Sequence, residues 1–189
     1  MKETQQPAAS ETAVEALPAP QGIGMAVAFD WGLAVQIVLT PITITFFNLP
    51  AEAKIPGVDP TLGNVLLFVV AWPVAIGLIL FGEMVRRGRN WARKIQVVAN
   101  ALLSLVGIAQ LVNLYQSIKG GNFWSLVPEV ILVIFSPLIF WRLASPSTAR
   151  WFKSVTAAEA RKRHGGAWPL LIAVWAIVGG VLQTIASIK

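Results

Sequence analysis

Five apolar runs, each roughly 20 residues long, dominate the sequence. They cover residues 26–49, 62–81, 95–116, 126–143 and 168–188. A helix rises about 1.5 Å per residue, so each run can cross a hydrocarbon core of about 30 Å. An open sheet cannot satisfy its backbone in lipid, and the runs lack the alternation of barrel strands. We therefore predict an all-α integral membrane protein, with five transmembrane helices in one bundle over residues 25–189.

The composition agrees with a membrane domain and separates it from a polar N-terminal segment. Only 13% of the residues are charged, whereas a soluble domain carries about a quarter. Residues 1–24 are rich in Pro, Ala, Gln, Glu and Thr and contain no aromatic residue. We predict a disordered tail there. We expect the tail to be retained, because the run after it lacks a basic segment before it and is too long for a secretory signal.

The cations predict an orientation. Twelve of the 15 Lys and Arg residues fall on one side of the predicted topology: Lys2, Arg142 and the segments 82–94 and 144–167. Lys54, Lys119 and Lys189 fall on the other. Since loops rich in Lys and Arg stay in the cytoplasm, we expect the tail and both basic segments to be cytoplasmic and the C-terminus to lie outside. The predicted location is the plasma (inner) membrane.

The segment 145–166 is the longest connection between runs. Trp151, Phe152 and Val155 recur at helical spacing, and Thr156 with Glu159 matches a capping box. We predict one or two short helices on the membrane surface, where cations contact lipid headgroups. The candidate headgroup contacts are Arg86, Arg87, Arg89, Arg150, Lys153, Arg161, Lys162 and Arg163. Such a cluster first of all anchors the topology, and a sensor of lipid or surface potential is the alternative.

Polar residues inside the runs are the main pointers to function, because each needs a partner or a cavity. One stripe of the third run holds Gln96, Asn100, Ser104 and Gln110, and Asn113 extends it. Gln36 and Thr40 share a face of the first run. We predict a polar seam between the two helices, with a hydrophilic path for a small solute as the alternative.

Two of the acidic residues in or near the runs can be explained by interactions within their own helix, and a third could have a function. Glu83 should pair with Arg86 and Arg87, which follow three and four residues later. Asp30 lies near the start of its helix, where the helix dipole favours a carboxylate. Glu129 is the third, since Gln110, Asn113 and Gln183 could converge on it to form a proton or cation site. An interfacial carboxylate stabilised by the helix dipole is the simpler interpretation.

Most enzyme chemistry is excluded by composition. The chain has no Cys and a single His, and it carries no Gly-rich phosphate loop, HExxH motif or nucleophile elbow. The single His, His164, stands in the basic run ARKRHGG, and we expect it to be a solvated loop residue. We expect a non-enzymatic protein with no cofactor or metal and no nucleic-acid partner. The prediction is an accessory, structural or assembly component of a membrane complex, bound to lipids and to another membrane protein or to its own copies. The alternatives are a small carrier or channel that uses the polar stripe and Glu129, and the lipid sensor.

Two short motifs carry a resemblance. Residues 88–93 read GRNWAR and open a predicted helix, and residues 145–152 read SPSTARWF and follow a later one. The pattern resembles small uncharacterised bacterial multi-pass membrane proteins. The resemblance implies a four-helix membrane protein and no particular function, and the fifth run departs from it.

Overall fold

The computed structural model describes residues 20–46 and 60–188, and these are helical with no strand among them. The long helices are α1 (Ile23–Phe46), α2 (Pro60–Arg86), α3 (Asn90–Lys119) and α8 (Trp168–Ile188). A fourth span is built of η1 (Phe123–Ser125), α4 (Leu126–Val130), η2 (Ile131–Phe135) and α5 (Ser136–Ala144). Two short helices, α6 (Pro146–Ser154) and α7 (Ala157–Arg163), precede α8. Five of the described helical segments are long and apolar enough to cross a membrane, which confirms the predicted fold class.

The predicted spans differ from the helices mainly at their ends. α1 begins before the predicted first span, and α2 and α3 both continue into the basic segment that separates them. The predicted disordered tail lies outside the described residues, apart from its last few positions, and so does the end of the first run. Helices extend into the interface because their polar ends can meet water there.

A turn of π-helix interrupts the fourth span. Pro137 has no backbone N–H and its ring displaces the carbonyl of the residue four positions earlier, so the regular hydrogen-bond pattern cannot pass through it. The interruption falls directly before it, over η2, and Ser136 Oγ donates to Ile131 O at 3.2 Å. The proline therefore explains why this span is divided.

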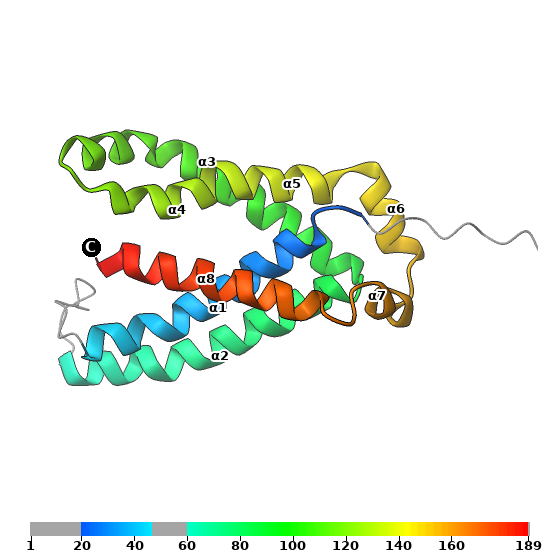
Figure 1. Cartoon of the computed structure of the whole chain (residues 1–189), viewed down its shortest axis with the longest axis horizontal. Coiled ribbons are helices and arrows are strands. Elements are labelled where there is room, and N and C mark those ends of the chain that lie inside the picture. Colours follow the sequence, from blue (N-terminus) through cyan, green and yellow to red (C-terminus); the bar gives the residue numbers. More distant parts are fainter. Residues whose placement is uncertain (1–19, 47–59, 189) are drawn as a thin grey trace, which may run out of the picture.

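The helices form two groups that lie one above the other in Figure 1. The first, named here the α1 group, contains α1, α2 and α8, with α1 packed against both of the others. The second, the α3 group, contains α3 and the fourth span. The two groups meet most closely at the end that also holds α6, α7 and the α2–α3 turn, called the basic end below.

Small residues allow the closest helix contacts. A Cβ on Gly180 would lie 2.6 Å from Gly32 O, and a Cβ on Gly32 would lie 3.2 Å from Ala176 O. The small-residue face of the last helix thus packs against α1 of the same chain. In the α3 group, a Cβ on Gly107 would lie 2.7 Å from Leu132 Cβ, which brings α3 equally close to η2.

A hydrophobic core at the basic end joins the two helix groups to α6 and α7. Its buried members come from six helices and are Ile23, Ala26, Val27, Val85, Ala92, Ile139, Leu143, Trp151, Phe152 and Ala160. Trp151 and Phe152 of α6 are therefore packed into the protein, and α6 is a structural part of the bundle. Ser145 and Thr156 cap α6 and α7 by accepting hydrogen bonds from the backbone N–H of Thr148 and Glu159.

The α2–α3 turn depends on a glycine at the same end. Gly88 has φ +71°, and a Cβ there would lie 2.6 Å from Val155 Cγ1. Only glycine adopts this conformation at low cost. Arg93, one turn further on, is buried and donates through Nη1 to Leu143 O at 2.9 Å. It satisfies a carbonyl at the end of α5 and ties α3 to the fourth span.

Candidate functional site: a buried polar cluster and an apolar cleft

A buried polar cluster links the two helix groups. Gln96 Nε2 of α3 donates to Asp30 Oδ1 of α1 at 2.7 Å. Asn100 Nδ2 donates to Gln96 Oε1 at 2.9 Å, and Ser104 Oγ donates to Asn100 O at 2.6 Å. Asp30, Gln96 and Asn100 are each no more than 3% exposed. The α3 stripe therefore reaches α1 through Asp30, a residue that the sequence interpretation left to the helix dipole.

The cluster has two oxygens with no partner. Asp30 Oδ2 and Asn100 Oδ1 are buried and accept no hydrogen bond from any described residue. A buried acceptor without a donor costs about 1–3 kcal/mol. The cluster can therefore accept a further hydrogen bond, for example from a water molecule, and its side chains otherwise bond to one another.

The residues expected on the α1 side of the seam bond within their own helix. Thr40 Oγ1 donates to Gln36 O at 2.8 Å, and Thr43 Oγ1 donates to Thr40 O at 2.9 Å. Gln36 and Thr40 are both half-buried, and neither side chain forms a hydrogen bond with α3 in the described structure. Within the described structure, the α3 stripe forms hydrogen bonds with α1 at Asp30 and at Ala26, whose backbone carbonyl accepts from Gln96 Nε2 at 3.4 Å.

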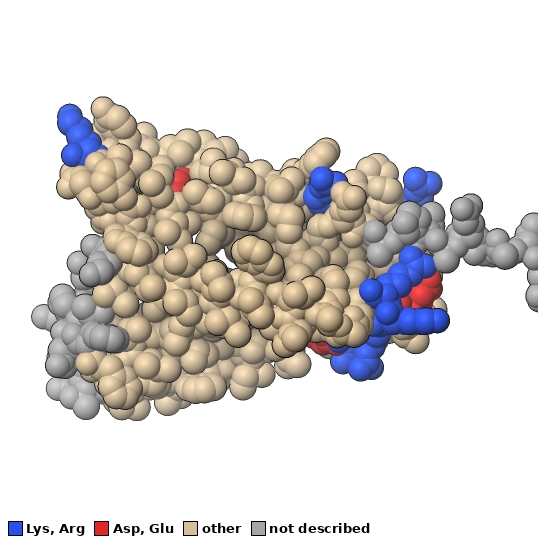
Figure 2. Space-filling view, in the orientation of Figure 1, with Lys and Arg blue, Asp and Glu red and all other residues tan. Residues whose placement is uncertain are grey.

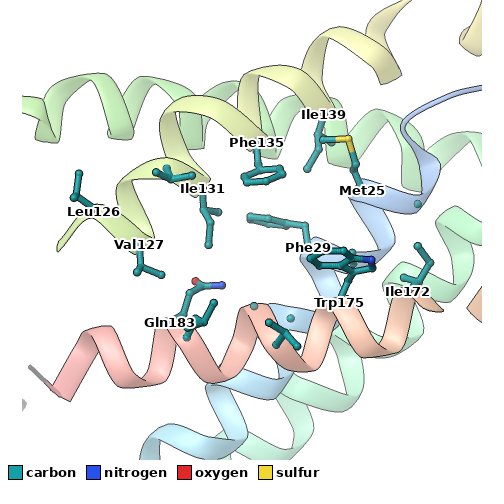
Figure 3. A pocket seen from close by; sticks show the side chains of 17 residues that line it. Met25, Phe29, Leu126, Val127, Ile131, Phe135, Ile139, Ile172, Trp175 and Gln183 are labelled. Atoms are coloured by element: carbon teal, nitrogen blue, oxygen red, sulfur yellow. The ribbon is translucent and has the colours of Figure 1, made fainter. Parts of the chain in front are cut away.

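The residues expected around Glu129 are distributed over separate surfaces. Glu129 of α4 is buried, and its Oε1 has no partner among the described residues. Gln110 and Asn113 are exposed on α3. Gln183 of α8 is half-buried and points into a cavity beside α4 (Figure 3). The structure thus shows no hydrogen bond from Glu129 to any of the three.

An apolar cleft lies between the two helix groups. Its volume is about 670 Å³, and Figure 3 shows its walls on α1, on the fourth span and on α8. Phe29, Phe135 and Trp175 contribute aromatic rings, whereas Gln183 is the one polar side chain among the lining residues. Sequence reasoning missed this cleft, because the lining residues of each helix look like ordinary membrane-facing residues.

The basic end carries both paired and unpaired cations, and Lys and Arg gather there in Figure 2. Glu83 forms ion pairs with Arg86 and Arg87, which confirms the local pairing predicted for it. Arg163 pairs with Glu159 at 2.7 Å. The other candidate headgroup contacts are exposed and form no ion pair within the described part of the chain; they are Arg89, Arg150, Lys153, Arg161 and Lys162.

His164 lies buried within this end rather than in a solvated loop. Its ring is 4.8 Å from that of Trp168 and 6.0 Å from that of Trp151, measured between centroids. Its backbone carbonyl accepts from Arg86 Nη1 at 2.9 Å, whereas Nδ1 has no partner among the described residues. Burial lowers the pKa of His164 below its usual 6.5, because the charged form is poorly solvated there.

These features define what the described residues can do. They hold no group of three His, Asp or Glu residues able to bind a metal ion. The cleft offers apolar walls, and the polar cluster offers two unpartnered acceptors. No protein-family model, curated protein or solved structure matches the chain, so the resemblance to small bacterial membrane proteins stays a prediction.

Proposed function

We propose that the protein is a non-enzymatic accessory or assembly component of a membrane complex, and that α3 binds a transmembrane helix of another membrane protein. The binding surface is named here the amide face and comprises Gln110 and Asn113. These residues are three positions apart and lie on one side of α3. Both are exposed, and neither forms a hydrogen bond within the described part of the chain.

The amide face carries the proposal because of its depth. Gln110 lies nine residues before the end of α3 at Lys119, or roughly 14 Å along the helix axis. The polar interface on each side of the hydrocarbon core is only about 5–8 Å thick. With Lys119 at the interface, Gln110 lies within the hydrocarbon, where an amide without a partner is unfavourable. Polar side chains in this position stabilise contacts between transmembrane helices by about 0.6–2 kcal/mol each.

The other polar groups support an accessory role over a carrier. Gln96 and Asn100 are buried and bond to Asp30 and to each other, so they act as a seam between helices. The cleft is lined by apolar residues except at Gln183 and offers a polar solute few partners. Catalysis is likewise unsupported, because the described residues present no nucleophile and base in contact.

A crosslinking experiment tests the partner. A photo-crosslinking amino acid is placed at Val106, an exposed position one turn before Gln110, and the native membrane is irradiated. We expect a crosslink to one other membrane protein, identified by mass spectrometry, which the double variant Gln110→Leu, Asn113→Leu loses. Tyr115→Leu is the control, because Tyr115 is an exposed polar residue of α3 about 140° around the helix from Gln110 and about 160° from Asn113. Absence of any crosslink, a crosslink only between copies of the chain, or equal loss in the control would contradict the proposal.

The proposal includes the plasma membrane and an orientation, with the basic end in the cytoplasm. The chain has no native cysteine, so a single introduced thiol reports one position. Lys162→Cys at the basic end and Asn122→Cys at the opposite end are both exposed. A membrane-impermeant maleimide added to intact cells should label only Cys at position 122. Labelling of position 162 alone would reverse the orientation.

A further inference from the structure

The dimensions of the apolar cleft fit a small apolar molecule such as a lipid chain. The cleft falls within the range of about 300–1,000 Å³ typical of small-molecule sites. Its lining on α8 runs from Ile172 to Gln183, roughly 16 Å along the axis. On the fourth span the lining runs from Leu126 to Ile139, roughly 20 Å, so the cleft is at least as deep as one leaflet of a 30 Å hydrocarbon core.

The lining also selects an apolar occupant. Met25, Phe29, Phe135 and Ile139 face the same space from two different helix groups (Figure 3). A polar molecule would lose its hydrogen bonds in such surroundings, whereas a hydrocarbon chain would lose none. The cleft lies between transmembrane helices, so lipid is the molecule that surrounds it.

A cation lies just beyond the cleft lining, toward the basic end. Arg142 follows Ile139 by three residues on α5, and Gln21 precedes Met25 by four. Arg142 Nη1 donates to Gln21 Oε1 at 2.7 Å, which joins α5 to the segment directly before α1. The guanidinium lies 5.0 Å from the Trp141 ring centroid and forms no ion pair with any described carboxylate. A guanidinium has several N–H groups and matches the geometry of a phosphate, so further donors remain for one.

From this juxtaposition we propose that the cleft binds one acyl chain of an anionic phospholipid whose phosphate lies at Arg142. The lipid belongs to the leaflet on the side of the basic end, and its chain extends along α8 toward Gln183. The cation Arg142 lies toward the membrane surface and the apolar cleft extends from it into the membrane, which is the order of the phosphate and the acyl chain in a phospholipid. The site is separate from the amide face of α3, so the lipid and the proposed protein partner can be tested independently.

Two glycines provide a matched test of the cleft. Gly179 lines the cleft, and a Cβ there meets nothing within 4 Å, so a larger side chain can enter the space without a clash. Gly77 on α2 is equally open but does not line the cleft. Both substitutions remove a glycine from a helix, which favours folding. Gly179→Phe therefore fills the site, and Gly77→Phe controls for an added aromatic side chain in the membrane.

The measurement is native mass spectrometry of the full chain, delipidated in detergent and then titrated with phosphatidylglycerol or phosphatidylcholine. We expect one tightly retained phosphatidylglycerol in the wild type and in Gly77→Phe, and at least about tenfold weaker retention in Gly179→Phe. Arg142→Gln should bind both lipids alike, because loss of a charge-assisted contact weakens binding by about tenfold or more. Equal retention in the two glycine variants, or an unchanged preference for phosphatidylglycerol in Arg142→Gln, would overturn the assignment.

Discussion

The hydrogen bond between Gln96 and Asp30 should contribute measurably to stability, and Gln96→Leu tests this contribution. The substitution removes the one hydrogen bond that Asp30 accepts through its side chain and leaves both of its carboxylate oxygens buried without a donor. Asn100 keeps an acceptor, because its Nδ2 also donates to Gln96 O at 2.9 Å. Leaving a buried acceptor without a donor costs about 1–3 kcal/mol, and hydrogen bonds measured between membrane helices contribute up to about 1.7 kcal/mol. We expect a loss of about 2 kcal/mol.

The assay is thermal unfolding in mild detergent, followed by the fluorescence of the eight Trp residues. For a chain of this length, about 2 kcal/mol corresponds to a decrease in Tm of about 4–8 °C. Asp30→Leu removes the buried carboxylate itself, so Gln96→Leu should cost much less in that background. Gln116→Leu, an exposed amide on the same helix, should leave Tm nearly unchanged. An equal cost of Gln96→Leu with and without Asp30 would refute the reasoning.

Three further predictions concern packing and charge. Gly180→Leu should destabilise the protein by about 3 kcal/mol in the same thermal assay, since its Cβ would lie 2.6 Å from Gly32 O, whereas Gly179→Leu should not. Burial lowers the pKa of His164 below 6.5, so its contribution to stability is complete above pH 6.5 and decreases as the pH falls below that value. The Tm difference between pH 7.5 and pH 5.5 should therefore shrink in His164→Leu, and an unchanged difference would contradict the buried placement. Glu129→Gln should keep or raise Tm, because it removes a charge from a buried oxygen without a partner; a clear decrease would indicate a cationic partner for Glu129.

Sequence reasoning succeeded where the signal is local or repeats along one helix. The five spans follow from run length, the Glu83 ion pairs from their spacing, and the cap at Thr156 from its motif. The depth of Asp30 in the membrane could also have identified it as the partner of Gln96. Asp30 lies seven residues into α1 and Gln96 six residues into α3, so both lie roughly 10 Å from the basic end of their helices. Matching depths would have paired them in place of Gln36 and Thr40.

Features that depend on relative helix positions could not be derived in this way. The separation into two helix groups, and hence the cleft, depends on which apolar faces meet, and in a membrane almost every face is apolar. The burial of Trp151 and Phe152 could not be predicted either, because an amphipathic segment can cover a membrane surface or a protein core with the same residues. His164 follows α7 into that core, although its basic neighbours indicated a solvated loop.

The contacts between the helix groups explain why the cleft begins where it does. At the basic end, α1 and α3 share the hydrophobic core, and the hydrogen bond from Gln96 to Asp30 joins them one level further into the membrane. Beyond that level α3 approaches η2 at Gly107, while α1 approaches α8 at Gly32, so each group packs within itself. Small residues hold each group together and thereby leave the large apolar side chains between the groups unpaired with one another. Filling that space from Gly179 should therefore change lipid retention without changing the contacts within either group.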